Sequence, residues 1–222
     1  MSRSAEGTLI PARIVFDFGL RPEYITSAVE YIYRVLDTID ETLLAEGSAR
    51  ISELVELANL SAIVGNLFRG GVTKGSSGVF QANRPHTYPD LLGVGEGCQD
   101  IEIKVALETN KPKGHLAKPG PHLTLRYVLA NQDGTYLRGK KNRGNVVWIW
   151  EIRAGLLRER HFSCSNTEGD SGKTAVINRE GMQSLTVIYC DLKRCPHSSA
   201  GQIYREFTQY LSGNNTDQSL SD

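Results

Sequence analysis

Two acids and a lysine lie within a short segment of the chain, at a spacing that could bring them to one reaction site. They are Asp90, Glu102 and Lys104. From Ile101 onward the residues alternate between apolar and polar, which predicts a β-strand with Glu102 and Lys104 on its polar face. Side chains two residues apart on that face lie about 7 Å apart at Cα, because a strand rises about 3.3 Å per residue. Asp90 can join them if Leu91–Gln99 folds back as a hairpin.

This set of residue types suggests a particular chemistry. Two carboxylates that face one pocket repel each other unless a positive charge lies between them. Mg²⁺ fills this role with oxygen ligands from one or two carboxylates, and it keeps several of its waters. Such an ion lowers the pKa of a coordinated water and stabilises charge on a phosphate, while a nearby lysine can hold the water or the phosphate. Together these groups indicate phosphodiester hydrolysis.

The segment resembles the PD-(D/E)xK nuclease superfamily, in particular its type II restriction endonucleases. The match consists of Pro89-Asp90, eleven intervening residues and Glu102-Ile103-Lys104, and it covers this part of the chain alone. The resemblance implies an α/β fold with a restriction-endonuclease-like core, a central mixed sheet flanked by helices, Mg²⁺ as cofactor and double-stranded DNA as substrate. It implies that Asp90 and Glu102 are metal ligands, and that Lys104 orients the water or stabilises the transition state.

Members of this superfamily often add an acid from a helix that precedes the motif. By resemblance, Glu56 is the expected additional metal ligand, and Glu53 is the alternative. Both lie in a segment, Arg50–Phe68, whose many apolar residues predict a largely buried helix closed by Gly70-Gly71.

The charge distribution favours a nucleic-acid partner more than the net charge does. The formal net charge is zero, but residues 111–160 hold eleven Lys and Arg against three Asp and Glu. A local basic surface is what binding to a phosphate backbone needs. Within it, a glycine-spaced loop is the expected DNA contact, because arginine and asparagine can read bases and lysine can bind phosphate. The residues expected to bind DNA are Arg138, Lys140, Lys141, Asn142 and Arg143. The alternative is a solvated loop with a chance excess of lysine.

The expected organisation is a single nuclease domain over residues 1–212, followed by a flexible tail over 213–222. The domain divides into an N-terminal helical part (1–70), a catalytic sheet with DNA-contact loops (86–195) and a C-terminal helix (199–211). Further expected elements are a strand at Arg13–Phe18, a helix from Pro22 to Gly47, a loop at Gly70–His86, strands at His122–Ala130, Val146–Ile152 and Leu185–Leu192, and a polar excursion at Ser163–Lys173.

Other features of the composition narrow the class of protein. No stretch approaches twenty apolar residues, so no membrane span is expected. The start of the chain lacks a signal-peptide core, so its four cysteines are expected to be reduced thiols in the cytoplasm. Structural zinc is an alternative use of nearby thiol and imidazole groups, at His161, Cys164, Cys190, Cys195 and His197.

The sequence therefore predicts a Mg²⁺-dependent endonuclease, in the first place a homodimeric type II restriction enzyme that cuts a short specific site in double-stranded DNA. Two alternatives remain open. One is a monomeric repair or nicking nuclease with the same chemistry, and the other is a DNA-binding module without catalysis. In the latter, the acids would be structural. For the motif itself, the alternative is a surface-facing strand whose Glu102 and Lys104 are solvated.

Overall fold

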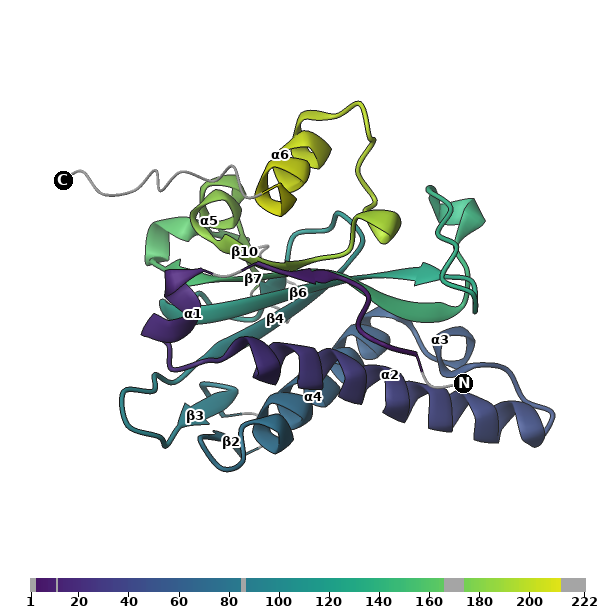
Figure 1. The fold of residues 1–222 in the computed structure, drawn as a ribbon, viewed down its shortest axis with the longest axis horizontal. Helices are drawn as coiled ribbons and strands as arrows, with labels where there is room; N and C mark the ends of the chain where they lie inside the picture. Colours follow the sequence, from purple (N-terminus) through teal and green to yellow (C-terminus); the bar gives the residue numbers. More distant parts are fainter. Residues whose placement is uncertain (1–2, 11, 85–86, 166–173, 213–222) are drawn as a thin grey trace.

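A five-stranded mixed sheet crosses the centre of the molecule (Figure 1). The computed structural model describes residues 3–10, 12–84, 87–165 and 174–212. The strand order is β1-β10-β7-β6-β4, and only β4 and β6 run parallel to each other. The strands of this sheet are β1 (Thr8–Leu9), β4 (Glu102–Leu107), β6 (Gly120–Ala130), β7 (Val146–Leu157) and β10 (Thr186–Cys190). A mixed α/β architecture with a central mixed sheet was expected, and this coarse description is confirmed.

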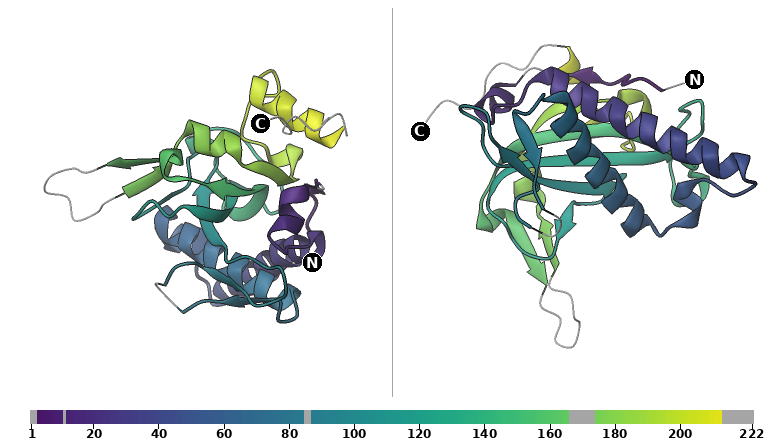
Figure 2. Two further views of the ribbon diagram at one scale, coloured as in Figure 1. Left: turned by 90° about the vertical axis from the view of Figure 1, so that its left-hand side faces the viewer. Right: turned by 90° about the horizontal axis from the view of Figure 1, so that it is seen from below.

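Two smaller sheets accompany the central one. One pairs β2 (Phe80–Ala82) with β3 (Leu91–Gly93), and the other has the order β5-β9-β8, formed by Lys113–Gly114, Thr174–Ile177 and Phe162–Ser165. Strands β8 and β9 project from the body of the molecule (Figure 2). The helices are α1 (Arg13–Asp17), α2 (Pro22–Ala45), α3 (Ile51–Leu54), α4 (Leu57–Gly75), α5 (Arg179–Ser184) and α6 (Gln202–Leu211), with short 3-10 turns η1 (Lys140–Asn142), η2 (Glu159–His161) and η3 (Leu192–Arg194).

Helices cover both faces of the central sheet. Helices α2 and α4 lie side by side on one face, and α5 and α6 lie on the other (Figures 1 and 2). On the α2/α4 face, Tyr33 packs edge-on against Trp148, with the ring centroids 5.3 Å apart, and the Tyr127 hydroxyl lies 3.0 Å from that of Ser61. The main apolar core fills this space, because the inward residues of α2, α4, β4, β6 and β7 are almost fully buried.

Several local patterns in the sequence gave the correct element. Helix α2 begins at Pro22, whose missing N–H costs nothing in the first turn. The strand expected at His122–Ala130 lies within β6, the one expected at Val146–Ile152 lies within β7, and the strand expected at Leu185–Leu192 contains β10. The C-terminal helix is α6.

The strand expected at Arg13–Phe18 is wrong, because this segment forms the short helix α1. The apolar side chains of this segment do not point alternately to two faces, as they would in a strand. Instead Val15 and Phe18 are both buried against the core, and the Val15 amide donates to the carbonyl of Ala12 at 3.0 Å. Tertiary burial of two residues three apart favours a helical turn over an extended strand.

The single helix expected at Arg50–Phe68 begins where predicted, but it is wrong in its middle and at its C-terminal end. Val55 and Glu56 are extended, which separates α3 from α4, and α4 continues to Gly75 through the two glycines expected to end it. Gly71 has a packing role within α4. A Cβ built there would lie 2.6 Å from Cα of Ala28, so α2 and α4 approach each other more closely than any larger residue allows.

The two segments expected to be irregular contain strands. The region expected to be a loop at Gly70–His86 includes the end of α4 and all of β2. Of this region, Pro85 and His86 lie outside the described residues. The polar excursion at Ser163–Lys173 lies largely between the paired strands β8 and β9, and its residues 166–173 lie outside the described part, as does the tail at 213–222.

Among the helices of the described residues, none combines the length and the apolar character that crossing a bilayer requires.

The two neighbouring glycines of α4 give a stability prediction with an internal control. Replacing Gly71 by Ala forces α2 and α4 apart, and we expect it to lower the free energy of unfolding by about 1–3 kcal/mol. Gly70 has room for a Cβ, since the nearest atom, Cε1 of Tyr31, would be 3.5 Å away. Gly70→Ala should therefore raise stability by about 0.5–1 kcal/mol, because alanine favours a helix interior. Urea unfolding of the two variants measures this, and equal shifts would contradict the close-approach explanation.

Candidate active site

Asp90 is placed by backbone contacts on both sides of its segment. Its carbonyl accepts from the amide of Asn83 at 3.0 Å, and the next residue, Leu91, exchanges two hydrogen bonds of 3.0 and 2.9 Å with Ile101. Strand β4 is the edge strand of the central sheet, so its outward backbone groups are open to this segment. The chain between Leu91 and Gln99 does fold back, as the sequence predicted.

The Asp90 side chain then closes the free edge of β4. Its Oδ2 accepts a hydrogen bond of 2.8 Å from the amide of Ile103, which lies between Glu102 and Lys104 in the chain. This contact sets the Asp90 carboxylate beside that of Glu102. Burial and the negative charge of Glu102 raise the pKa of Asp90, as expected for two neighbouring acids.

Glu102 is almost completely buried, with 2% of its surface exposed. Its Oε1 accepts from the ammonium groups of both Lys104 and Lys118, the latter at 3.0 Å. Burial alone would raise the pKa of Glu102, but the two lysines outweigh it and the pKa is lowered. Glu102 is therefore ionised and paired inside the protein. The alternative in which Glu102 is a solvated residue on a surface strand is wrong.

The structure brings together the three residues chosen from the sequence, and it adds three that the sequence did not indicate. Lys118 contacts Glu102 from the connection between β5 and β6. Arg69 of α4 is close enough for its charge to favour the ionised form of Asp90. His122 lies directly opposite Glu102 in the parallel β4–β6 pairing. The position of His122 opposite Glu102 follows from the register of that pairing, and no local sequence pattern specifies the register.

His122 is buried with one ring nitrogen bonded and the other not. Its Nδ1 lies 2.9 Å from the carbonyl of Gly120, and its Nε2 has no protein partner among the described residues. Burial lowers the pKa of His122 to about 4, so the imidazole is neutral near pH 7. Thr124 Oγ1 and Glu102 Oε2 are likewise buried without partners, so three polar atoms on adjacent register positions are available to a water or a ligand.

The donor set fits a hydrated hard cation. Oε1 of Glu102 accepts from both lysines, and its Oε2 has no protein partner among the described residues. Oδ2 of Asp90 accepts from the amide of Ile103. Within the described ranges, no three His, Cys, Asp or Glu side chains are grouped so that they could hold a metal ion. Two carboxylates with waters completing the shell suit Mg²⁺, whereas zinc takes three or four protein ligands.

Glu56 and Glu53 are not part of this cluster. Glu56 caps the N-terminus of α4 and is exposed. Arg69, the α4 residue near Asp90, lies thirteen positions further along, which is about 20 Å at 1.5 Å per residue. Glu53 accepts from Asn145, beside the start of β7. The structure therefore does not bring either acid to Asp90 and Glu102, because α4 runs from the far end of β4 toward Asp90.

The basic loop also lies at the far end of β4. Arg143 forms a bidentate ion pair of 2.8 and 2.7 Å with Glu108, which follows the last residue of β4. Glu108 lies six residues from Glu102, or about 20 Å along the strand. Asn142 bonds to the carbonyl of Arg138 at 2.8 Å and so shapes the loop. The exposed side chains are those of Arg138, Lys140, Lys141 and Asn142.

The thiols named as possible zinc ligands do not form a site in the described residues. Cys190 and Cys195 are buried, and burial raises the pKa of both thiols. They behave as small apolar residues of the core.

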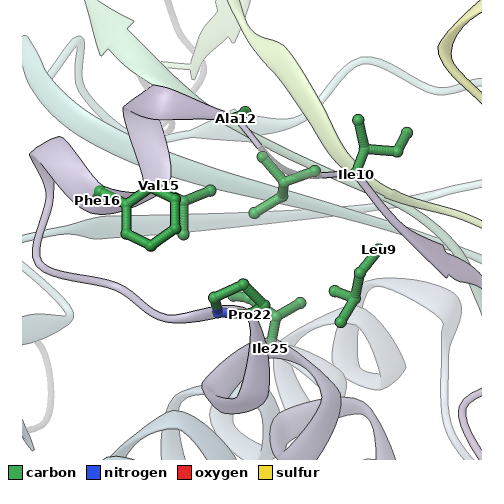
Figure 3. Close-up of a pocket in the computed structure, with 8 residues that line it drawn as sticks. Leu9, Ile10, Ala12, Val15, Phe16, Pro22 and Ile25 are labelled. Carbon is green, nitrogen blue, oxygen red and sulfur yellow. The ribbon is translucent and has the colours of Figure 1, made fainter. Parts of the chain in front are cut away.

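A cavity elsewhere in the molecule is lined by apolar residues. It lies between β1, α1, β10 and the start of α2, and Figure 3 shows the side chains around it. It is lined by Leu9, Ile10, Ala12, Val15, Phe16, Pro22, Ile25 and Ile188. A lining without a titratable group offers no acid, base or nucleophile.

Comparison with protein-family models gives no match to this chain, and comparison with curated proteins gives no significant match. The resemblance at Asp90, Glu102 and Lys104 therefore rests on these residues and their geometry.

The buried imidazole gives a prediction for acid stability. The pKa of His122 is about 4 in the folded protein against an ordinary value of 6.5, so between these values the unfolded chain binds a proton that the folded protein does not. The free energy of unfolding should fall as pH drops through this window, by roughly 3 kcal/mol at most. His122→Gln should lose less stability than the wild type between about pH 7 and about pH 4 in urea unfolding. Parallel losses in both proteins would show that His122 is not the group responsible.

Proposed function

We propose that this protein is a Mg²⁺-dependent endonuclease that hydrolyses phosphodiester bonds in double-stranded DNA, with a restriction-endonuclease-like core. The observation that carries the proposal is the position of the Asp90 carboxylate, bonded to the amide of Ile103 between Glu102 and Lys104. Such a reaction needs two adjacent acids and a lysine. Here the pKa of one acid, Asp90, is raised, and the lysine, Lys104, lies on the same strand as the other acid, Glu102.

Each residue has a distinct part in the proposed reaction. Asp90 and Glu102 would hold Mg²⁺, which when bound supplies an activated water and stabilises charge on the phosphate. Lys104 would orient the attacking water or offset the charge that develops on the phosphate. The burial of Glu102 strengthens these interactions, because a charge acts more strongly where water is scarce.

The substrate class is a proposal that follows from charge. The half-buried Lys118 lies beside Glu102, and the exposed Lys140 and Lys141 lie on the loop near Glu108. Both groups could contact one phosphate backbone. Within the enzyme class, we propose a type II restriction endonuclease that acts as a homodimer, since a two-fold protein can cut both strands of a symmetric site.

The first test removes the proposed catalytic groups one at a time. Asp90→Asn, Glu102→Gln and Lys104→Met should each lower Mg²⁺-dependent cleavage of phage DNA by about a hundredfold or more and leave DNA binding in place. Glu96→Gln is the matched control, because Glu96 is an exposed acid in the connection that joins β3 to β4. Cutting by all three variants at the wild-type rate would refute the site.

The products distinguish the candidate enzymes. Discrete fragments whose ends map to one short sequence support a restriction enzyme, and persistent nicks in a supercoiled plasmid support a nicking or repair nuclease. No product from the wild-type protein over a range of divalent metals would favour a DNA-binding module without catalysis.

The second test concerns the basic loop. Lys140 and Lys141 are exposed, and if each contacts a phosphate, changing both to Gln should reduce the slope of log affinity against log salt by about 1.8. Arg143 is left intact because it is paired with Glu108. Lys74→Gln, at the exposed C-terminal end of α4, is the control and should leave the slope unchanged. An unaltered slope in the double variant would place the DNA contacts elsewhere.

A further inference from the structure

Two lysines bind the same oxygen of Glu102, but they are held very differently. Lys104 lies on strand β4, and its side chain ends against Gly114 of β5, where a Cβ would be 3.1 Å from its Cε. Only 12% of the Lys104 side chain is exposed, against 31% for Lys118. Lys118 lies on the connection between β5 and β6, outside any helix or strand. Of the two cations, Lys118 is therefore the one that can leave.

The contacts of Lys118 hold it at the site without enclosing it. Its ammonium lies 3.0 Å from Glu102 Oε1 and 4.8 Å from the centre of the Tyr88 ring. The Tyr88 hydroxyl donates to the carbonyl of Pro119 at 2.8 Å, which fixes the backbone next to Lys118. Tyr88 is close to Asp90 in the chain, so Lys118 stands at the exposed side of the acid pair.

The charges explain why Lys118 should move. With Asp90 and Glu102 ionised, the four groups Asp90, Glu102, Lys104 and Lys118 sum to zero. A divalent cation held by the two acids would raise this sum to two positive charges within a partly buried cluster, at a substantial electrostatic cost. The cost falls if one ammonium leaves Glu102 and pairs with an incoming anion.

We propose that Lys118 is a releasable counter-ion that couples metal binding to DNA binding. In the free protein it neutralises Glu102, and on metal binding it transfers to a phosphate of the DNA backbone. This inference rests on the proposed function, since it assumes that the acid pair takes a metal and that the substrate is a polyanion. Lys118 is thus a substrate-positioning residue in addition to the three groups of the motif.

The coupling has a defined sign. Lys118 competes with the metal for Glu102, so the metal should bind the free protein less tightly than two carboxylates alone would allow. DNA that captures Lys118 removes the competitor and tightens metal binding, and by linkage the metal tightens DNA binding by the same factor. A residue that only stabilised the fold would not link the two ligands.

The test titrates the free protein with Mn²⁺ and follows it by electron paramagnetic resonance. Lys118→Met should bind Mn²⁺ about five- to tenfold more tightly than the wild type, the range of a typical coupling between sites. Lys118→Arg keeps the charge and should match the wild type. Lys111→Met is the control, because Lys111 is an exposed lysine of the connection between β4 and β5 and makes no ion pair within the described part of the chain. Circular dichroism confirms that each variant is folded.

A second measurement compares the affinity for a labelled phage-DNA fragment in Ca²⁺ and in EDTA. Ca²⁺ should strengthen DNA binding by the wild type, and this gain should shrink in Lys118→Met but not in Lys111→Met. Equal Mn²⁺ affinities in the wild type and Lys118→Met would overturn the inference and leave the metal site standing. A wild type that binds no Mn²⁺, or binds it equally well after Asp90→Asn, would instead overturn the metal site itself.

Discussion

The open edge of β4 is the constraint on which the candidate site depends. An edge strand presents backbone amides that no neighbouring strand can satisfy. Here the Asp90 carboxylate accepts from one of them, at Ile103, and the Leu91–Ile101 pair satisfies the groups beside it. A structural need of the sheet therefore brings a second acid next to Glu102. The repulsion between these acids is a consequence of the fold, and it is what a bound cation would relieve.

Burial of Glu102 sets the second condition. The polar face of β4 does not meet solvent, because it continues into β6 and β7 beneath α5 and α6. On the same face Glu151 is fully buried between Arg126 and Arg153, and Arg153 also donates to the α5 carbonyl of Met182 at 3.0 Å. Each buried acid there is paired with two cations. Both cations that bind Glu151 lie on the neighbouring strands β6 and β7. One of the two cations that bind Glu102, Lys118, lies on a loop, so it can move away from Glu102.

Local patterns in the sequence were enough to predict the strand at Glu102 and the return of the chain to Asp90, and the resemblance implied the mixed sheet. They could not predict contacts set by register or by packing between distant elements. His122 and Lys118 reach Glu102 only because β6 runs parallel to β4. Gly71 was expected to end a helix by its conformational freedom, yet it serves the contact with α2. Glu56 was chosen by resemblance to the nuclease superfamily, but it lies at the end of α4 that is far from Asp90.

The position of the basic loop constrains how a duplex could lie on the protein. The loop is anchored at Glu108, about 20 Å along β4 from Glu102. Successive phosphates on one strand of DNA are about 3.4 Å apart along the axis, so this distance corresponds to about six base pairs. In the proposed nuclease, a duplex parallel to β4 would meet Lys118 at the scissile phosphate and the loop about half a turn away. In that proposal, contacts at this separation would suit a short recognition site read beside the point of cleavage, with chemistry and sequence reading at opposite ends of β4.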